Sequence, residues 1–370
     1  MYSWIEINKA HLAQNCAAFI SLLGKERFAP VLKSNAYGHG LEPFYKLLSE
    51  YDPEWICVVY LQEAEILRNL GFQKNIFIVG PVPPKDYSWA RKLDAQIPVY
   101  DLQSLASWSA DKKRPLGHLK IDTGLTRLGL SLEELEQAMP QLLSCKESLR
   151  GVYSHFANVE DVSNLRFAHS QIDRLKKARQ LLQDNGINLR SHISSSASSL
   201  IIPEARMDLC RIGISLYGFW PSELTKLSFH TLNEMPAFHL KPVLTWKTKV
   251  VQVRDIPRGR YIGYGCTFQA PHAMKIAVLP VGYNEGFPRV SSNKNTSVWF
   301  CGERCPVIGR ICMNLMMIDI THVDSVDEKD PVTLIGDFPD VSATRLASIC
   351  DTISYEIVTR LNPLIPRLLI

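Results

Sequence analysis

Residues 29–40 read APVLKSNAYGHG, and the rest of the chain is best understood from this stretch. The run from Ala29 to Leu32 is short and apolar, which is typical of a buried strand. Lys33 ends the run, and the Asn- and Gly-rich residues after it are typical of a turn. A lysine at the end of a buried strand is partly desolvated, and desolvation lowers the pKa of its amine. We therefore expect Lys33 to be a nucleophile that can form a Schiff base.

Strand-like and helix-like patterns alternate from this stretch to about residue 220. Eight short apolar runs predict strands, at residues 28–32, 55–59, 76–79, 97–100, 118–121, 151–154, 189–193 and 209–211. Amphipathic segments such as SLEELEQAMPQLLSC lie between them. This alternation indicates a parallel sheet, and eight units favour a closed (β/α)8 TIM-type barrel. An open doubly wound sheet is the alternative, because periodicity alone does not show closure.

The pattern changes after about residue 230. From Val243 onward, strand-like runs such as LTWKTKVVQVRDI and MKIAVLPVGY follow one another, separated by turn residues. This is typical of a mostly-β domain. We place the boundary within residues 229–240, and assign residues 1–235 to the barrel and residues 236–370 to a C-terminal β domain.

Composition argues against several classes of partner. The net charge of the 370 residues is +4 and no basic run is present, which argues against nucleic acid and membrane surfaces. No apolar stretch reaches the roughly 18 residues that a transmembrane helix needs. The N-terminus lacks the features of a signal peptide, and the cysteines number nine, so we expect reduced thiols and a cytoplasmic location. Three of the cysteines (Cys301, Cys305 and Cys312) are close together but lack a fourth ligand, so we expect no metal site.

Ionisable residues gather where the predicted strands of the barrel end, namely Lys33, Lys120, Arg127, His155 and Arg211. No rule of core packing requires this. Because the catalytic groups of such barrels lie at the carboxyl ends of the strands, we expect the active site there. The loops after the last two strands often bind a phosphate, and here they carry Ser196 and Gly213.

The chain resembles the alanine racemase family, fold-type III enzymes that use pyridoxal 5'-phosphate (PLP). APVLKSNAYGHG is similar to the family's cofactor-attachment motif, and the strings KIDTGLTRLGL, YIGYGCTF, VGYNEGFPR, GRICMNLMM and TISYEIVTR extend the resemblance to Arg360. Four sites depart from the usual family residues: Ser34 replaces Ala, Ser195 replaces Asn, Asn284-Glu285 replaces Ala-Asp, and Asn314 replaces Asp.

The resemblance implies that PLP is attached to Lys33 and that Arg211 faces its pyridine nitrogen. The residues implied to bind the phosphate are Tyr37, Ser196, Gly213, Ile214 and Tyr355. An arginine can only donate to the ring nitrogen, which weakens the ring as an electron sink. This suits racemisation better than reactions that need strong carbanion stabilisation.

The resemblance also implies two catalytic bases, Lys33 on one face of the substrate and Tyr264 on the other. Tyr264 would be activated through His155 and Arg211, and in the family it comes from the opposite subunit of a homodimer. A contact of Tyr264 with the barrel of its own subunit would leave the same pattern in the sequence, so this alternative stays open. Arg127 is implied to bind the substrate carboxylate, oriented by Lys120 if that lysine is carbamylated.

The remaining implied site residues are Met313, near the substrate carboxylate, and Tyr283, which gates the entrance with Tyr355. The expected function is a PLP-dependent alanine racemase that interconverts L- and D-alanine and supplies D-alanine for peptidoglycan. The alternatives are a racemase for serine or another amino acid, a fold-type III decarboxylase and a non-catalytic PLP-binding protein. Arg211 and the pair of Lys33 and Tyr264 argue against the decarboxylase.

Overall fold

The computed structural model describes residues 2–232, 238–324 and 330–370. The chain divides into two compact units. One, the barrel unit, comprises residues 13–34 and 45–240, and the other, the C-terminal unit, comprises residues 1–12, 35–44 and 241–370. The boundary predicted between residues 235 and 236 lies outside the described residues.

The barrel unit contains parallel strands that follow the predicted runs closely. They are β2 (Phe28–Pro30), β3 (Trp55–Val58), β4 (Asn75–Ile78), β5 (Ala95–Val99), β6 (Gly117–Lys120), β7 (Leu149–Tyr153), β8 (Arg190–His192) and β9 (Cys210–Ile212). Every residue of β3, β5 and β6 is buried. This is expected of a parallel sheet that is covered on both faces.

These strands close into a ring, which confirms the barrel and excludes the open sheet. Strands β3 to β8 form a six-stranded sheet in sequence order, and β2 pairs in parallel with β9. Two single bridges join the sheets, Val31 to Cys57 and Ser194 to Cys210. The carboxyl ends of all these strands therefore meet at one mouth of the barrel.

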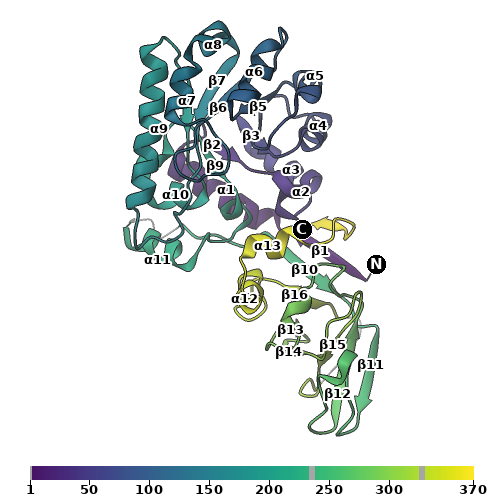
Figure 1. The fold of residues 1–370 in the computed structure, drawn as a ribbon. Helices are drawn as coiled ribbons and strands as arrows, with labels where there is room; N and C mark the ends of the chain where they lie inside the picture. The colour runs from purple at the N-terminus through teal and green to yellow at the C-terminus, as the bar shows by residue number, and fades with distance from the viewer. Residues whose placement is uncertain (1, 233–237, 325–329) are drawn as a thin grey trace. The chain divides into compact units, whose positions relative to one another are not determined.

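Helices connect the strands of the barrel and lie outside them (Figure 1). The helices from Lys9 to Leu232 are α1 (Lys9–Leu23), α2 (Lys33–Tyr37), α3 (Leu41–Leu48), α4 (Leu61–Asn69), α5 (Tyr87–Lys92), α6 (Leu102–Ala110), α7 (Leu132–Gln137), α8 (Met139–Ser144), α9 (Arg166–Asp184), α10 (Ser196–Ile201) and α11 (Glu223–Leu232). Within the described ranges, no helix has the length and hydropathy needed to cross a membrane.

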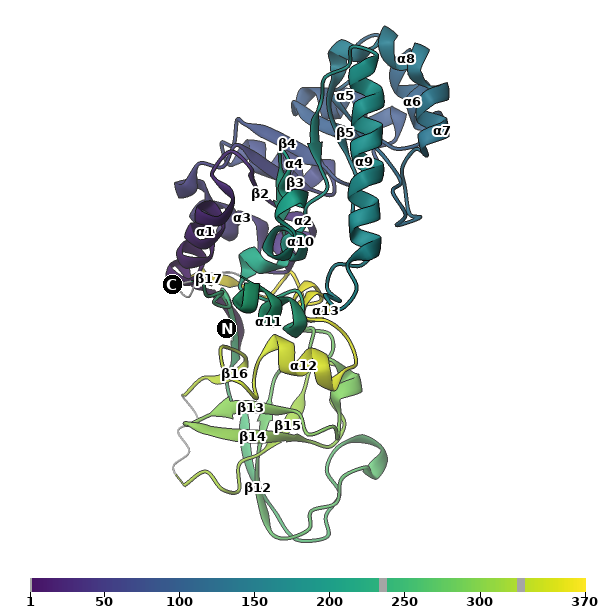
Figure 2. The ribbon, with the colours of Figure 1, turned by 90° about the vertical axis from the view of Figure 1, so that its left-hand side faces the viewer.

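The C-terminal unit is mostly β, as predicted, and contains one large sheet (Figure 2). Its strands are β1 (Ser3–Ile7), β10 (Leu244–Thr248), β11 (Gln252–Ile256), β12 (Met274–Leu279), β13 (Ser297–Phe300), β14 (Glu303–Ile308), β15 (Met316–Asp319), β16 (Val332–Ile335) and β17 (Arg367–Leu369). The helices α12 (Ala343–Ile349) and α13 (Ser354–Thr359) complete it. β1 was not predicted to belong here. It pairs antiparallel with β10 and parallel with β17.

Candidate active site

Lys33 follows the first barrel strand at the carboxyl end, as predicted. The two residues before it hold the chain in the ring, because the Val31 N–H donates to the Ile212 carbonyl and the Leu32 N–H to the Cys57 carbonyl, at 2.9 and 2.8 Å. Lys33 is half-buried. Burial lowers its pKa, and the positive charges of Arg127 and Arg211 lower it further. A lysine in this environment is a better nucleophile than a solvated one.

The motif after Lys33 adopts a left-handed helical turn. Residues 34–37 have φ values of 57°, 56°, 52° and 51°, although none of them is glycine. Runs of non-glycine residues in this conformation are rare and are maintained by surrounding contacts. Asn35 provides two such contacts. Its carbonyl accepts from the Gly40 N–H at 3.0 Å, and its Oδ1 accepts from the Leu41 N–H at 2.8 Å.

Within the C-terminal unit, the turn brings Tyr37 near Tyr355 of α13. The two ring centroids lie 6.2 Å apart. Gly38 follows with φ +80°, so close to α13 that a Cβ on it would lie 1.9 Å from the Val358 carbonyl oxygen. The two tyrosines predicted to contact a phosphate are thus neighbours, and glycine is required beside them.

Arg211 is buried at the mouth, with 7% of its surface exposed. Its Nη2 donates to the Ser154 carbonyl at 2.8 Å and to the Ile193 carbonyl at 3.3 Å. The same nitrogen lies 3.4 Å from His155 Nδ1, so the predicted pair of Arg211 and His155 is brought together. Burial and the charges of Arg211 and Arg127 hold the pKa of His155 well below its ordinary value. His155 is therefore a neutral imidazole at neutral pH.

Lys120 and Arg127 bracket a tight loop between β6 and α7. The Leu130 N–H donates to the Lys120 carbonyl at 2.8 Å, and the Asp122 carboxylate accepts from the Gly124 and Thr126 N–H groups at 2.9 and 3.1 Å. Lys120 is 5% exposed, and burial lowers its pKa to about 8, with Arg127 and Arg211 adding to the effect. Arg127 is exposed.

The predicted phosphate loops are joined through one hydroxyl. Ser196 Oγ accepts from the Gly213 N–H at 3.0 Å and from the Ser215 N–H at 3.4 Å. Ile214, between them, is buried. The Ser215 hydroxyl is also buried, and it has no hydrogen-bond partner among the described residues. Hydroxyl groups thus concentrate at this end of β9, as a phosphate site requires.

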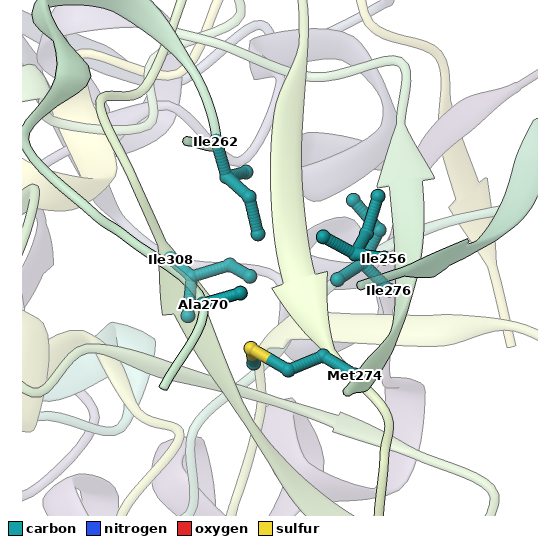
Figure 3. Close-up of a cluster of buried hydrophobic side chains, with 6 residues drawn as sticks. All are labelled: Ile256, Ile262, Ala270, Met274, Ile276 and Ile308. Atoms are coloured by element: carbon teal, nitrogen blue, oxygen red, sulfur yellow. The ribbon is translucent and has the colours of Figure 1, made fainter. Parts of the chain in front are cut away.

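Tyr264 lies in the C-terminal unit, near the tip of a hairpin, and is 69% exposed. The hairpin is closed by hydrogen bonds from the Ile262 N–H to the Phe268 carbonyl and from the Ala270 N–H to the Arg260 carbonyl. Its base is anchored in a small apolar core (Figure 3) formed by Ile256, Ile262, Ala270, Met274, Ile276 and Ile308. The tyrosine therefore projects from a supported hairpin.

Tyr283 and Met313 lie on two loops that pair with each other. The Tyr283 N–H donates to the Cys312 carbonyl at 3.1 Å and the Asn284 N–H to the Met313 carbonyl at 2.9 Å. Both side chains are exposed, by 42% and 56%. The structure thus places Tyr283, predicted to gate the entrance with Tyr355, beside Met313, predicted to lie near the substrate carboxylate.

Sequence reasoning missed the polar side chains inside the barrel behind Arg211. His192 accepts a hydrogen bond from Arg211 and lies beside His118, and both histidines are fully or almost fully buried. A signal was available, since both histidines lie within the predicted strand runs 118–121 and 189–193. No group of three or more His, Cys, Asp or Glu side chains in the described ranges is arranged to hold a metal ion.

Comparison with known proteins agrees with this arrangement. The alanine racemase N-terminal domain matches residues 7–221 and the alanine racemase C-terminal domain matches residues 243–369. Alanine racemase of Leptospira interrogans is 38% identical over 374 residues, which cover 100% of this chain and 96% of that protein.

Two solved structures extend the comparison. Alanine racemase of Clostridium difficile 630 has a TM-score of 0.90 at 28% identity, covering 100% of this chain and 96% of that one. Alanine racemase of Bartonella henselae with covalently bound pyridoxal phosphate has a TM-score of 0.86 at 24% identity, over 100% of both chains, and shows likeness of fold. With both domain matches and a relative at 38% identity over the full chain, this protein belongs to the alanine racemase family, whose members are isomerases.

Proposed function

We propose that this protein is a PLP-dependent alanine racemase that interconverts L- and D-alanine with two bases, Lys33 and Tyr264. The observation that carries the proposal is Arg211, buried at the barrel mouth near a lysine of lowered pKa. An arginine has only donors to offer a ring nitrogen. A fold-type III decarboxylase is disfavoured for this reason.

The residues present fit the cofactor. The positive charges of Arg127 and Arg211 lower the pKa of both Lys33 and Lys120, and the charge of Lys33 also lowers that of Lys120. Such a concentration of positive charge favours an anionic ligand. The buried Ser215 hydroxyl and the Ser196 hydroxyl supply donors for a phosphate. Gly213, Ile214, Tyr37 and Tyr355 are the other proposed phosphate contacts.

When bound, PLP would supply an electron sink that makes the Cα–H of an amino acid acidic. Lys33 holds the cofactor and exchanges a proton on one face of the substrate, because its lowered pKa keeps a larger fraction of the amine neutral. Tyr264 exchanges the proton on the opposite face. A free tyrosine has a pKa of about 10, so it needs nearby positive charge to act as a base.

Arg127 is proposed to bind the substrate carboxylate, since the planar guanidinium suits bidentate contact. Lys120, with a pKa of about 8, has enough neutral amine to react with CO2: the N–C bond forms and a proton leaves. The resulting carbamate is an anion that would orient Arg127. Met313 would donate its N–H to the carboxylate, and Tyr283 would gate the entrance with Tyr355.

We further propose a homodimer in which residues 236–370 of one subunit supply Tyr264 to the barrel, residues 1–235, of the other. The exposed tyrosine on its anchored hairpin supports this. A cytoplasmic location is supported by the nine scattered cysteines, an odd number that is typical of reduced thiols. Supply of D-alanine for peptidoglycan is the proposed cellular role.

Reconstitution with PLP and assay of both enantiomers of alanine and of serine would test the function. We expect racemisation of alanine in both directions at a rate that exceeds that of serine. Faster turnover of serine would reassign the substrate, and amine formation with loss of CO2 would indicate a decarboxylase. Lys33→Ala should abolish the visible absorption of the lysine-bound cofactor. An unchanged spectrum in that variant would contradict the attachment site.

A further inference from the structure

A chain of hydrogen bonds runs through the interior of the barrel and ends at Arg211. Arg211 Nη1 contacts His192 Nδ1, and His192 Nε2 lies 3.0 Å from His118 Nδ1. His118 Nε2 lies 2.7 Å from Gln96 Oε1, and Gln96 Nε2 donates to Asn75 Oδ1 at 3.0 Å. The residues come from β9, β8, β6, β5 and β4 in that order.

The arginine end determines the direction of every hydrogen bond in the chain. A guanidinium can only donate, so His192 Nδ1 must accept and the ring proton must lie on Nε2. That proton is donated to His118 Nδ1, which places the His118 proton on Nε2, where it is donated to Gln96. A second proton on either ring would set two donors against each other, so both histidines must be neutral.

The other end gives the same direction independently. Asn75 Nδ2 donates to the Glu54 carbonyl at 3.1 Å, and a backbone carbonyl can only accept. The Asn75 oxygen must therefore face Gln96, so Gln96 presents its amide nitrogen to Asn75 and its oxygen to His118. A donor-only group at one end and an acceptor-only group at the other leave one arrangement of protons.

The packing around the chain holds the two imidazoles in place. The Tyr153 ring stacks on the His192 ring, with 4.9 Å between the centroids and 7° between the planes. The centroids of the Phe77 and His118 rings lie 4.4 Å apart. Gly151 makes room for His118, because a Cβ on it would lie 2.3 Å from His118 Nδ1. His118 and His192 are 1% and 0% exposed.

The electrostatic environment supports neutral rings. Burial lowers the pKa of His118 to about 3, with Arg211, Arg150 and Arg190 acting in the same direction. Burial, Arg211 and His118 hold the pKa of His192 well below its ordinary value. The ionised groups acting on these rings are thus all cationic.

We propose that Asn75, Gln96, His118 and His192 form a polarised hydrogen-bond chain that positions the Arg211 guanidinium. In this proposal Gly151 leaves the space that the His118 ring occupies. The consequence for catalysis rests on the proposed function, in which Arg211 faces the cofactor ring. The arrangement of protons does not rest on the proposed function, because it follows only from the donors and acceptors along the hydrogen-bond chain. These five residues are positioning residues, since they act through Arg211.

The proton arrangement can be tested without cofactor or substrate. In protein labelled with 15N at histidine, long-range 1H–15N spectra distinguish the two neutral tautomers and the imidazolium. We expect His118 and His192 to be Nε2–H tautomers with no titration between pH 5.5 and pH 9. An Nδ1–H tautomer, or protonation of either ring in this range, would overturn the proposal. A failed racemase assay would leave this result unaffected.

Two variants test the positioning role, and a third is the matched control. Gly151→Ala crowds His118, and Gln96→Met removes the acceptor for its Nε2–H. Gly117→Ala, at the residue before His118 on β6, places its Cβ 2.8 Å from Trp108 Cζ2 instead of against the His118 ring. With PLP saturating, we expect kcat for alanine to fall at least about tenfold in the first two, as misplaced catalytic groups do, and the His118 15N signals to shift. Gly117→Ala should keep wild-type signals and kcat within about twofold. Equal kcat losses in all three variants would overturn the positioning role.

Discussion

The Asn314 side chain donates from Nδ2 to Oε1 of Glu285 across 2.7 Å. The other oxygen of this carboxylate accepts from the Gly282 N–H at 2.8 Å, and Asn284 Nδ2 donates to Oε1 at 3.0 Å. One carboxylate thus ties the loop that carries Tyr283 to the loop that carries Met313. Asn284, Glu285 and Asn314 are among the positions at which the chain departs from the usual family residues, and here they form one hydrogen-bonded group.

The first prediction concerns the charge at this junction. Asn314→Asp should set two carboxylates against each other and loosen both loops, raising KM for alanine about threefold while costing less than about 1 kcal/mol of stability, because the site is exposed. Asn314→Ala removes the donor without adding charge and is the control. The double variant with Glu285→Gln should recover KM, since the new amide can donate to the new carboxylate. Steady-state kinetics that show equal KM values for the Asp and Ala variants would contradict the role of charge.

Tyr264→Phe should separate the two faces of the substrate. Racemisation must slow equally in both directions, because the two enantiomers have equal free energy. Exchange of the Cα hydrogen with solvent deuterium need not, and Lys33 should still catalyse it for one enantiomer. Since the side chain is 69% exposed, folding should be unchanged. Loss of exchange to the same extent for both enantiomers, measured by NMR, would count against a base specific to one face.

Lys120 should make stability depend on pH in a defined direction. Its pKa is lowered to about 8 in the folded state, mainly by burial, so between about pH 8 and the ordinary lysine value of about 10.4 the unfolded chain binds more protons. The contribution of Lys120 to the free energy of unfolding therefore rises with pH in this interval. Relative to Lys120→Met, the protein without cofactor should gain about 1–2 kcal/mol between pH 7 and pH 9.5 in CO2-free buffer. Denaturant unfolding curves that shift in parallel for the two proteins would refute this.

Much of the barrel could be predicted from sequence because its signals are local. Each strand is a short apolar run bounded by polar or turn residues, and the polar residues that follow the runs reach the carboxyl ends of the strands. Lys33, Lys120 and Arg211 were located in this way. Closure was favoured by the count of eight units, but periodicity alone could not exclude an open sheet, because closure depends on pairings such as Val31 with Cys57.

Other features depend on contacts distant in sequence. Ser3–Ile7 reads as an ordinary strand, yet its partners lie more than 200 residues away, in β10 and β17. The left-handed turn after Lys33 is invisible because its residues, Ser34 to Tyr37, are not glycines. The chain behind Arg211 combines side chains from five strands, and only their proximity in space reveals it.

Ser196→Ala should weaken the binding of PLP more than the control substitution Ser199→Ala does. The Ser196 oxygen already accepts from the Gly213 and Ser215 N–H groups, so its own proton is left to donate to a phosphate oxygen. We expect Kd for PLP to rise about tenfold, the loss of one hydrogen bond to a charged group. Ser199→Ala is the control, because that buried hydroxyl donates to the Ser196 carbonyl in the same helix. Fluorescence titration of the cofactor-free variants that gives equal Kd values would exclude the Ser196 contact.

Gly38→Ala should show how closely the lysine motif packs against α13. The substitution incurs two costs: a left-handed φ of +80° and a Cβ placed 1.9 Å from the Val358 carbonyl oxygen. Gly24→Ala incurs only the first, since Gly24 has the same φ of +80° and nothing within 4 Å of its Cβ. We expect Gly24→Ala to cost about 1 kcal/mol of unfolding free energy, and Gly38→Ala at least about 2 kcal/mol more, because backbone atoms cannot move aside cheaply. Denaturant unfolding of the two variants measures the difference, and similar values would mean that α13 can retreat from the motif without loss.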